Sequence, residues 1–264
     1  MRVALPTIVA MRILLTNDDA IHAPGLAAIY HELAREHQVS VVAPDSPKSG
    51  GSHAVTIRHP VIWRTVQTAG GFKGVSVEGS PADCVKLAMN SLLPQPPELV
   101  VSGINSGLNT GIHVLYSGTV AGAMEGAILG CPAISVSLQL QPEMDYARAA
   151  RIAADVIRQI LVTKPEGRQV FNVNIPTFKP GWPRGVRVAP QSTRPTMDKI
   201  EKRIDPNGRE YYWLSGDFVE WDDAADTDIH LVRDGYVCVT PLQFNLTDTA
   251  RMQSLASRSW TLTE

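Results

Sequence analysis

Residues Arg12–Asp19, with the sequence RILLTNDD, decide the fold. The run at 13–16 consists of apolar residues and one β-branched threonine, which is typical of a strand buried in a parallel sheet. Behind Pro24, which suits the first turn of a helix, apolar residues recur at helical spacing up to residue 33. A buried strand, a polar turn and an amphipathic helix begin a βαβ unit. We therefore predict an α/β protein.

The same alternation of short β-branched runs and amphipathic runs continues through the first two-thirds of the chain. It predicts a mostly parallel sheet whose strands are joined by helices. The further predicted strands are 39–43, 99–102, 133–137 and 171–175, and the further predicted helices are 81–92, 119–129 and 147–161.

The composition changes beyond about residue 190, where polar and aromatic residues replace the compact apolar runs. Two segments, 199–204 and 209–214, flank the turn Asp205–Gly208, whose Asn-Gly pair is a strong signal for a β-hairpin. Aromatic side chains such as Trp213 would lie on this hairpin. An isolated two-stranded ribbon is barely stable in water, so we expect it to pack on another subunit.

The overall composition is that of an ordinary globular protein, with 44% of the 264 residues hydrophobic and 19% charged. The formal net charge is -2, from 24 Lys and Arg against 26 Asp and Glu, so no basic excess favours nucleic acid or a membrane as partner. No stretch of the sequence is long and apolar enough to span a bilayer. Pro6 interrupts the apolar N-terminus, so we interpret the first ten residues as an extension rather than a secretory signal.

The three cysteines, Cys84, Cys131 and Cys238, lie far apart and have no C-x-x-C spacing. This pattern suits neither a disulfide scaffold nor a zinc site. We expect each thiol to fill a core position in a protein of a reducing compartment, the cytoplasm.

Two adjacent carboxylates, Asp18 and Asp19, follow the first predicted strand directly. Ligands of parallel sheets bind beyond the carboxyl ends of the strands. The two charges repel each other and raise a pKa unless a cation neutralises them, so a bound metal is the simplest interpretation. The alternative is that one aspartate caps the following helix and the other faces solvent. The pair alone leaves both interpretations open.

Three further loops at predicted strand ends or helix starts are unusually polar. The loop 44–53 is rich in hydroxyls and glycine, and the loop 102–111 combines three glycines with amide and hydroxyl side chains. The segment 116–119 begins a helix rich in small residues, where free N–H groups and the helix dipole suit a phosphate. The candidate ligands are oxygen donors without a His or Cys cluster, which favours Mg²⁺ or Mn²⁺ over zinc. The combination predicts phosphate-ester chemistry.

These motifs together resemble the survival protein E (SurE) family of 5′/3′-nucleotidases. The likeness extends from about Met11 to Thr247, and several motifs in the same order are far more specific than any one alone. The motifs are RILLTNDD at 12–19, VAPD at 42–45 with Ser49, GSPADCV at 79–85, SGIN at 102–105, YSGTV at 116–120 and GYVCVTPL at 235–242.

The resemblance implies a site for one divalent cation per subunit, Mg²⁺ or Mn²⁺, and a neighbouring phosphate site. The implied metal ligands are Asp18, Asp19, Ser49 and Asn105, and the implied phosphate-binding residues are Asn105, Asn109, Ser117, Gly118 and Thr119. Asp18 or Asp19 would also take the proton from the attacking water.

The resemblance also implies a Rossmann-like three-layer core at 11–190 and a C-terminal arm at 191–264 that is exchanged between subunits and returns to the core. It implies a homodimer or homotetramer. The implied activity is hydrolysis of nucleoside 5′- and 3′-monophosphates, and of short polyphosphate.

One departure from the family pattern is Ala20, because the family usually has glycine after the aspartate pair. If this position needs a positive φ, alanine costs roughly 1 kcal/mol or more. Three histidines, His22, His53 and His113, lie near the proposed site in the sequence. We expect them to lie on the surface or behind the ligands rather than to act as acid catalysts.

Other functions fit the residues less well. A phosphatase with an aspartyl-phosphate intermediate, of the haloacid dehalogenase type, needs Asp-x-Asp-x-Thr, whereas residues 17–21 are NDDAI. A serine hydrolase needs serine at the nucleophile elbow, whereas GINSG at 103–107 has Asn105 there. The alternative from another class is a non-catalytic nucleotide-binding or regulatory module, although the chain has no dinucleotide fingerprint and no P-loop.

Overall fold

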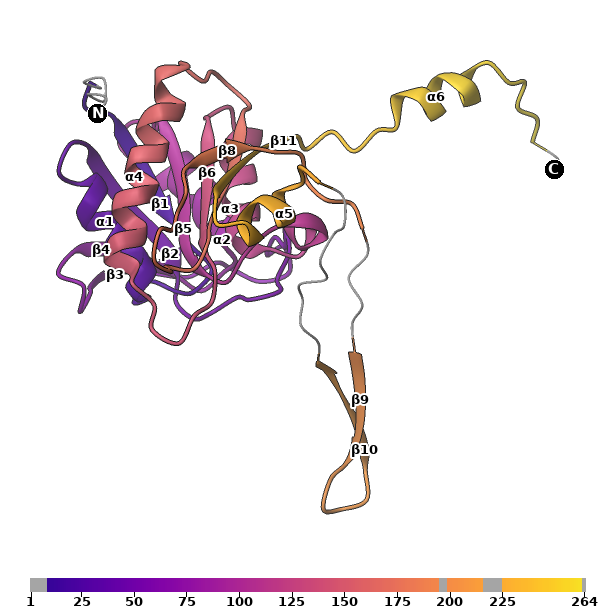
Figure 1. Cartoon of the computed structure of the whole chain (residues 1–264), viewed down its shortest axis with the longest axis horizontal. Coiled ribbons are helices and arrows are strands. Elements are labelled where there is room, and N and C mark those ends of the chain that lie inside the picture. The colour runs from indigo at the N-terminus through magenta and orange to yellow at the C-terminus, as the bar shows by residue number, and fades with distance from the viewer. Residues whose placement is uncertain (1–8, 195–198, 216–224, 263–264) are drawn as a thin grey trace.

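The computed structural model describes residues 9–194, 199–215 and 225–262, so most of the predicted N-terminal extension lies outside the described residues. Its main feature is a nine-stranded sheet with the order β3-β4-β2-β1-β5-β6-β7-β11-β8 (Figure 1). The structure confirms the predicted α/β class and the Rossmann-like three-layer arrangement. Within the described residues, no helix has both the length and the apolar character needed to cross a membrane.

The centre of the sheet is parallel, as the sequence predicts. It consists of β1 (Arg12–Thr16), β2 (Gln38–Pro44), β5 (Leu99–Ser106), β6 (Ala133–Leu138) and β7 (Val170–Ile175). The prediction missed four strands: β3 (Trp63–Gln67), β4 (Lys73–Val77), β8 (Val186–Val188) and β11 (Val237–Leu242). Two of the missed pairings, β3 with β4 and β11 with β7, are antiparallel.

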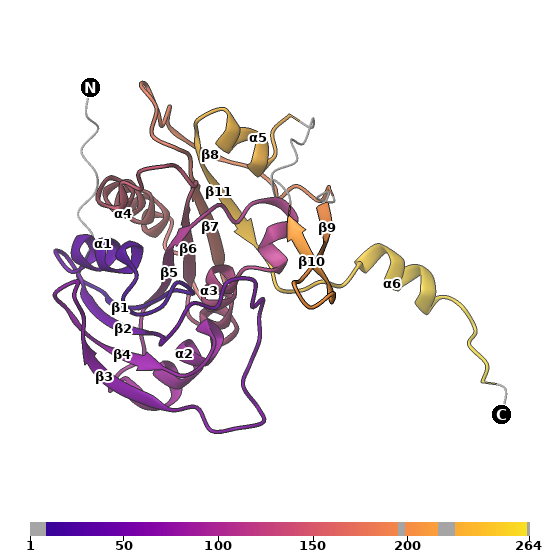
Figure 2. The same cartoon turned by 90° about the horizontal axis from the view of Figure 1, so that it is seen from below.

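Helices cover both faces of the sheet (Figure 2). One face carries α1 (Pro24–Leu33) and α4 (Tyr146–Val162), and the other carries α2 (Pro81–Leu87) and α3 (Gly118–Ile128). Each face has its own buried apolar cluster, so the sheet is packed on both sides. The helix predicted at 81–92 departs from regular α-helix, because η1 (Ala88–Leu92) continues α2 as a π-helix.

Two glycines let α3 lie unusually close to β5. A Cβ atom at Gly126 would come within 2.6 Å of Val100 Cγ2, and one at Gly122 would lie 3.0 Å from Ser102 Oγ. Protein interiors have no spare space for such an atom. The small residues therefore fix the depth of α3 and bring its N-terminus to the carboxyl ends of β1 and β5.

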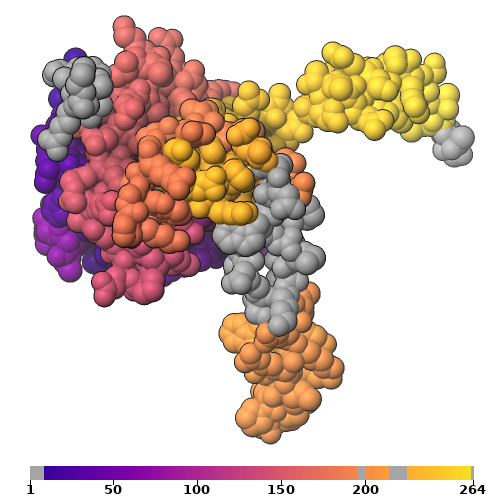
Figure 3. Space-filling view, in the orientation of Figure 1, coloured from indigo at the N-terminus to yellow at the C-terminus, as the bar shows by residue number. Residues whose placement is uncertain are grey.

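Two segments of the C-terminal part stand away from the body (Figures 1 and 3). The predicted hairpin is confirmed as an antiparallel pair of β9 (Lys199–Ile204) and β10 (Glu210–Ser215). The helix α6 (Thr249–Ala256) has no buried residue. Between these two segments, α5 (Asp228–Arg233) packs beside β11, which returns the chain to the main sheet.

Candidate functional site

The carboxyl end of β1 carries the aspartate pair and lies beside the carboxyl end of β5. The backbone N–H of Ser106 donates a hydrogen bond to Oδ2 of Asp19, with 3.1 Å between nitrogen and oxygen. Asn105, one residue earlier, donates from Nδ2 to the carbonyl oxygen of Gly107 at 2.8 Å. Because the amide nitrogen is engaged inside the loop, Oδ1 of Asn105 is the atom that can serve a ligand. The structure brings these two predicted residues together.

The N-terminus of α3 meets Asp18 from the other side. The hydroxyl of Thr119 donates a hydrogen bond to Oδ1 of Asp18. A Cβ atom at Gly118 would lie 2.9 Å from the Cβ of Asp18 and 3.0 Å from its Oδ2, so glycine is needed for this close approach. Ser117 caps the helix, since its hydroxyl accepts a hydrogen bond from the N–H of Val120 at 3.1 Å. The predicted phosphate segment therefore abuts the predicted metal ligand.

The loop after β2 approaches the same edge through its backbone. The N–H of Lys48 donates to the carbonyl oxygen of Asp18 at 2.8 Å, and the exposed Ser49 follows Lys48 directly in the sequence. Ser52 anchors the far side of this loop, because its hydroxyl donates to the carbonyl oxygen of Leu115 at 2.7 Å.

Asn109 belongs to a different hydrogen-bond network. It is buried, its Nδ2 donates to Ser137 Oγ at 2.9 Å, and its N–H donates to Oδ1 of Asn174 at 2.9 Å. Its carbonyl oxygen also accepts from Nδ2 of Asn172 at 2.7 Å. The side-chain nitrogen of Asn109 is thus bonded to β6 and its backbone to β7, and none of these bonds involves Asp18, Asp19 or α3.

The electrostatics of the aspartate pair favour a positive ligand. Burial raises the pKa of Asp18, and the neighbouring charge of Asp19 raises this pKa further, while the hydrogen bond from Thr119 lowers it without reversing the shift. Burial also raises the pKa of Asp19, against a lowering by the Ser106 N–H. None of the ion pairs formed among residues 9–194, 199–215 and 225–262 includes either carboxylate. A cation bound between the two carboxylates would offset both the cost of burying their charges and the repulsion between them.

Three buried oxygens beneath the pair support this interpretation. Thr16 Oγ1, Asn17 Oδ1 and Ser102 Oγ are fully buried and have no hydrogen-bond partner among the described residues. Such atoms are rare in folded proteins and gather at functional sites. The sequence prediction assigned no role to these three side chains, although Thr16 and Ser102 end the predicted strands 13–16 and 99–102 and Asn17 follows the first of them.

The donor chemistry fits a hard cation. The described residues contain no group of three or more His, Cys, Asp or Glu side chains that could hold a metal ion. The candidate set instead combines two carboxylates with amide and hydroxyl oxygens, the ligand types that Mg²⁺ and Mn²⁺ accept. The arrangement can therefore hold a divalent ion that a phosphate group helps to coordinate.

Ala20, which stands where the family usually has glycine, does adopt a positive φ. Its φ is +78°, in the left-handed region where a Cβ atom is strained. The turn is held by Asn17, whose Nδ2 donates to the carbonyl oxygen of Ala20 at 3.0 Å. The turn that directs the aspartates is formed in spite of the alanine.

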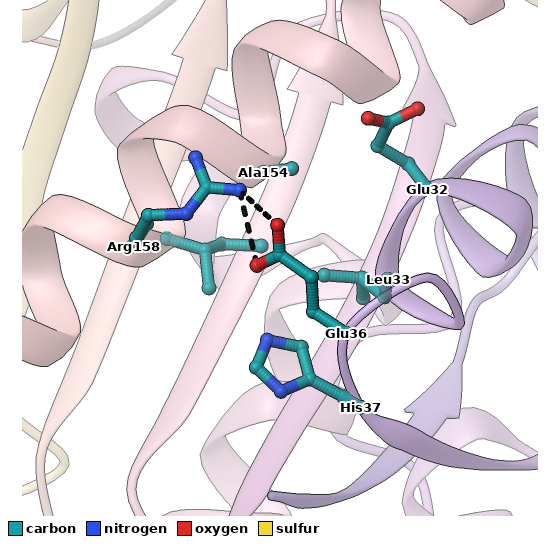
Figure 4. A pocket seen from close by; sticks show the side chains of 7 residues that line it. Glu32, Leu33, Glu36, His37, Ala154 and Arg158 are labelled. Atoms are coloured by element: carbon teal, nitrogen blue, oxygen red, sulfur yellow. Dashed lines mark hydrogen bonds and ion pairs between the residues drawn. The ribbon is translucent and has the colours of Figure 1, made fainter. Parts of the chain in front are cut away.

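Two hollows among the described residues differ in size and place. One, between α1 and α4 and beside the ion pair of Arg158 with Glu36, measures about 10 Å³ and is too small for a nucleotide (Figure 4). The other measures about 550 Å³ and lies along the outer face of α3. Its lining is mainly apolar and includes Met124 and Phe244, and it also includes Ser117 at the start of α3, so this hollow borders the predicted phosphate segment.

Comparisons with known proteins agree with this fold and identify its family. A family model described as "Survival protein SurE" matches residues 13–198. The chain is 43% identical over 252 residues to a protein named 5′-nucleotidase SurE from Moorella thermoacetica, an alignment that covers 94% of this chain and 95% of the relative. A protein of the same name from Rhodopirellula baltica is 43% identical, with 90% of this chain and 94% of the relative covered.

A solved structure shows the same architecture. The crystal structure of the SurE protein from Aquifex aeolicus aligns with a TM-score of 0.80 at 36% sequence identity. The alignment covers 92% of this chain and 98% of that one.

Proposed function

Since the chain belongs to the SurE family of survival proteins and is a nucleoside monophosphate phosphatase of the 5′-nucleotidase type, we propose that four oxygen donors at the carboxyl end of its sheet hold one divalent cation. The four donors are the side chains of Asp18, Asp19, Ser49 and Asn105. The observation that supports this most strongly is the aspartate pair itself: Asp18 is buried, Asp19 is half-buried, and the pKa of both carboxyl groups is raised. Mg²⁺ and Mn²⁺ share these ligand types, and either suits the site.

When bound, the cation would polarise the phosphoryl group and lower the pKa of a water molecule. The residues of this chain bind and orient the substrate. The backbone at Gly118 and Thr119, at the positive end of the α3 dipole, would receive the anionic phosphate oxygens. Ser117 fixes the helix start by its cap. Asp18 or Asp19 would accept the proton of the attacking water.

Two finer features belong to the same proposal. Asn105 and Asn109 both belong to the polar segment 102–111, and we assign the side-chain oxygen of each to the phosphate side of the site. Cleavage of 3′-monophosphates and short polyphosphate uses the same phosphate site and needs no further residue. The nucleoside has no specific contact in this proposal, so several bases should be accepted.

The C-terminal part, 191–264, is proposed as an arm that is exchanged between two or four copies and returns to the core of 11–190. The supporting observation is its exposed apolar surface. On the hairpin, Tyr212 and Trp213 are 56% and 55% exposed, and beyond α6 Trp260 is 72% exposed. Replacing Tyr212 and Trp213 by serine should lower the mass measured by light scattering, whereas Val162→Ser on α4 should leave it unchanged. Equal masses for all three proteins would contradict an assembly role for the hairpin.

The three cysteines support a reducing compartment as the location, and we propose the cytoplasm. Cys84, Cys131 and Cys238 are all buried free thiols. Burial raises the pKa of Cys131 and of Cys238 to about 12, so neither is activated as a nucleophile.

A phosphate-release assay tests the activity and its metal dependence. The purified protein is incubated with AMP, GMP and p-nitrophenyl phosphate, with Mn²⁺, with Mg²⁺ and with EDTA. We expect release with a metal and none with EDTA. Release that is equal in EDTA would remove the metal from the proposal. The alternative of a non-catalytic binding module is not favoured by the relatives, and it would require that no substrate is hydrolysed with either metal.

A further inference from the structure

Ser49 is the least constrained of the four proposed ligands. It is exposed, whereas Asp18 is almost fully buried. The chain turns sharply after it, with φ of +70° at Gly50 and +51° at Ser52. A ligand on such a loop is precise only if the loop is anchored on both sides. The upstream anchor is the hydrogen bond from the N–H of Lys48 to the carbonyl oxygen of Asp18.

The downstream anchor reaches into the interior of the protein. The N–H of Ser52 donates to the carbonyl oxygen of Tyr116 at 3.0 Å. The next residue, His53, places Nε2 at 2.7 Å from Oε2 of Glu125. Glu125 lies on α3, the helix whose first residues we assign to the phosphate. This contact therefore ties the loop of the metal site to the helix of the phosphate site.

Glu125 is a buried carboxylate with two partners. Its side chain is 3% exposed, and Oε1 lies 2.7 Å from Nζ of Lys86 on α2. Burial raises the pKa of Glu125, but the hydrogen bonds from His53 and Lys86 outweigh burial and lower the pKa below its ordinary value. A carboxylate held ionised in the interior is a strong and directional acceptor, and leaving it without a partner is costly.

We infer that Glu125 is a positioning residue that acts through His53 to hold Ser49 at the metal site. The inference rests on the proposed metal ligands. Neither Glu125 nor His53 is proposed to contact the cation or the substrate. If the pair served stability alone, its loss would lower the melting temperature and leave the affinity for the metal unchanged. If it positions Ser49, the affinity for the metal falls.

The test is Mn²⁺ binding without substrate, measured by the electron paramagnetic resonance signal of free Mn²⁺. His53→Ala removes the downstream anchor, and we expect the dissociation constant to rise about 10-fold, as for other residues that support metal ligands. His53→Gln keeps a donor toward Glu125 and should bind nearly as the wild type does. Glu125→Leu fills the buried space with an apolar side chain and should match His53→Ala, and the double variant should be no weaker than either.

The matched control is a variant that loses another hydrogen bond of the segment that follows Ser49. This bond is as short as that of His53 with Glu125 but lies farther from Ser49 along the chain. The hydroxyl of Thr56 donates to Oδ2 of Asp83 at 2.7 Å, so Thr56→Val should leave Mn²⁺ binding unchanged. Wild-type affinity in His53→Ala, while Asp19→Asn has lost binding, would overturn the positioning role alone. Wild-type affinity in Asp19→Asn would overturn the proposed metal site and this inference with it. Melting temperatures of the metal-free variants show that each one is folded.

Discussion

Two buried aspartates in this molecule, Asp18 and Asp83, differ in how the chain satisfies them. Both side chains belong to residues that are 4% exposed. Asp83 accepts hydrogen bonds from the N–H of Ser80 and from the N–H and hydroxyl of Thr56. Burial raises the pKa of Asp83, but these bonds outweigh it and lower the pKa. Asp18 instead faces a second carboxylate, Asp19, and its pKa is raised.

Asp83 is a structural carboxylate, whereas Asp18 has the surroundings expected of the cation ligand that we propose. At the start of α2 the chain supplies every donor itself, through a capping box of Ser80 and Asp83. At the end of β1 the chain buries a carboxylate, adds a second one, and leaves three nearby oxygens without a hydrogen-bond partner within the described part of the chain. Equal burial therefore has opposite consequences.

Asp18→Asn and Asp19→Asn should each lower turnover of AMP by at least about 100-fold, because an amide is a poor substitute for a charged ligand that also accepts a proton. Asp83→Asn should keep turnover near the wild-type value at a temperature where it is folded. Steady-state rates at saturating Mn²⁺ measure this. High activity in both Asp18→Asn and Asp19→Asn would contradict the distinction.

Mn²⁺ should stabilise the wild type and Asp83→Asn but not Asp18→Asn. A ligand at 100 times its dissociation constant adds about 2.7 kcal/mol to the free energy of unfolding. Thermal unfolding with and without Mn²⁺ measures the gain. An equal gain in Asp18→Asn would place the cation elsewhere.

Asp83→Asn should lower the free energy of unfolding by about 2 kcal/mol at pH 7, because two backbone donors and a hydroxyl lose their charged acceptor. The pKa of Asp83 is lower in the folded protein than the ordinary 3.8. The stabilisation that ionised Asp83 gives the folded protein is therefore present above pH 3.8. It is lost as the pH falls through the lower pKa that Asp83 has in the folded protein. Urea unfolding from pH 7 down to acid should show the difference between wild type and variant shrinking. A difference that grows in acid would refute the assigned sign.

Ala20→Gly should raise the free energy of unfolding by roughly 1 kcal/mol, because it relieves the positive φ at this turn. The aspartates keep their places, so turnover should not fall. Urea unfolding and AMP hydrolysis measure both quantities. A less stable glycine variant would show that the alanine side chain contributes packing that exceeds the strain.

The parts of the fold that were predictable from sequence are those with strong local patterns. The run 13–16 is buried on both faces and could be identified as a central strand. In contrast, β3 lies at the sheet edge and is mostly exposed, so its residues show no apolar alternation. The strand β11 was also missed, because its antiparallel place beside β7 depends on a long return of the chain rather than on its own pattern.

The candidate site was predictable only in part. The adjacent charges of Asp18 and Asp19 are visible in the sequence, and Ser49 and Asn105 were implied by the family resemblance. The contact of His53 with Glu125 joins residues 72 positions apart, and no local signal indicates it. The positive φ of Ala20 could be posed as a question from sequence, but only the backbone geometry answers it.

The most direct test of the account is a crystal soaked in Mn²⁺ and measured at the manganese absorption edge. We expect an anomalous peak between the carboxylates of Asp18 and Asp19, within coordination distance of Oδ1 of Asn105, and no peak at Asp83. An intact crystal without a peak at the aspartate pair would contradict it.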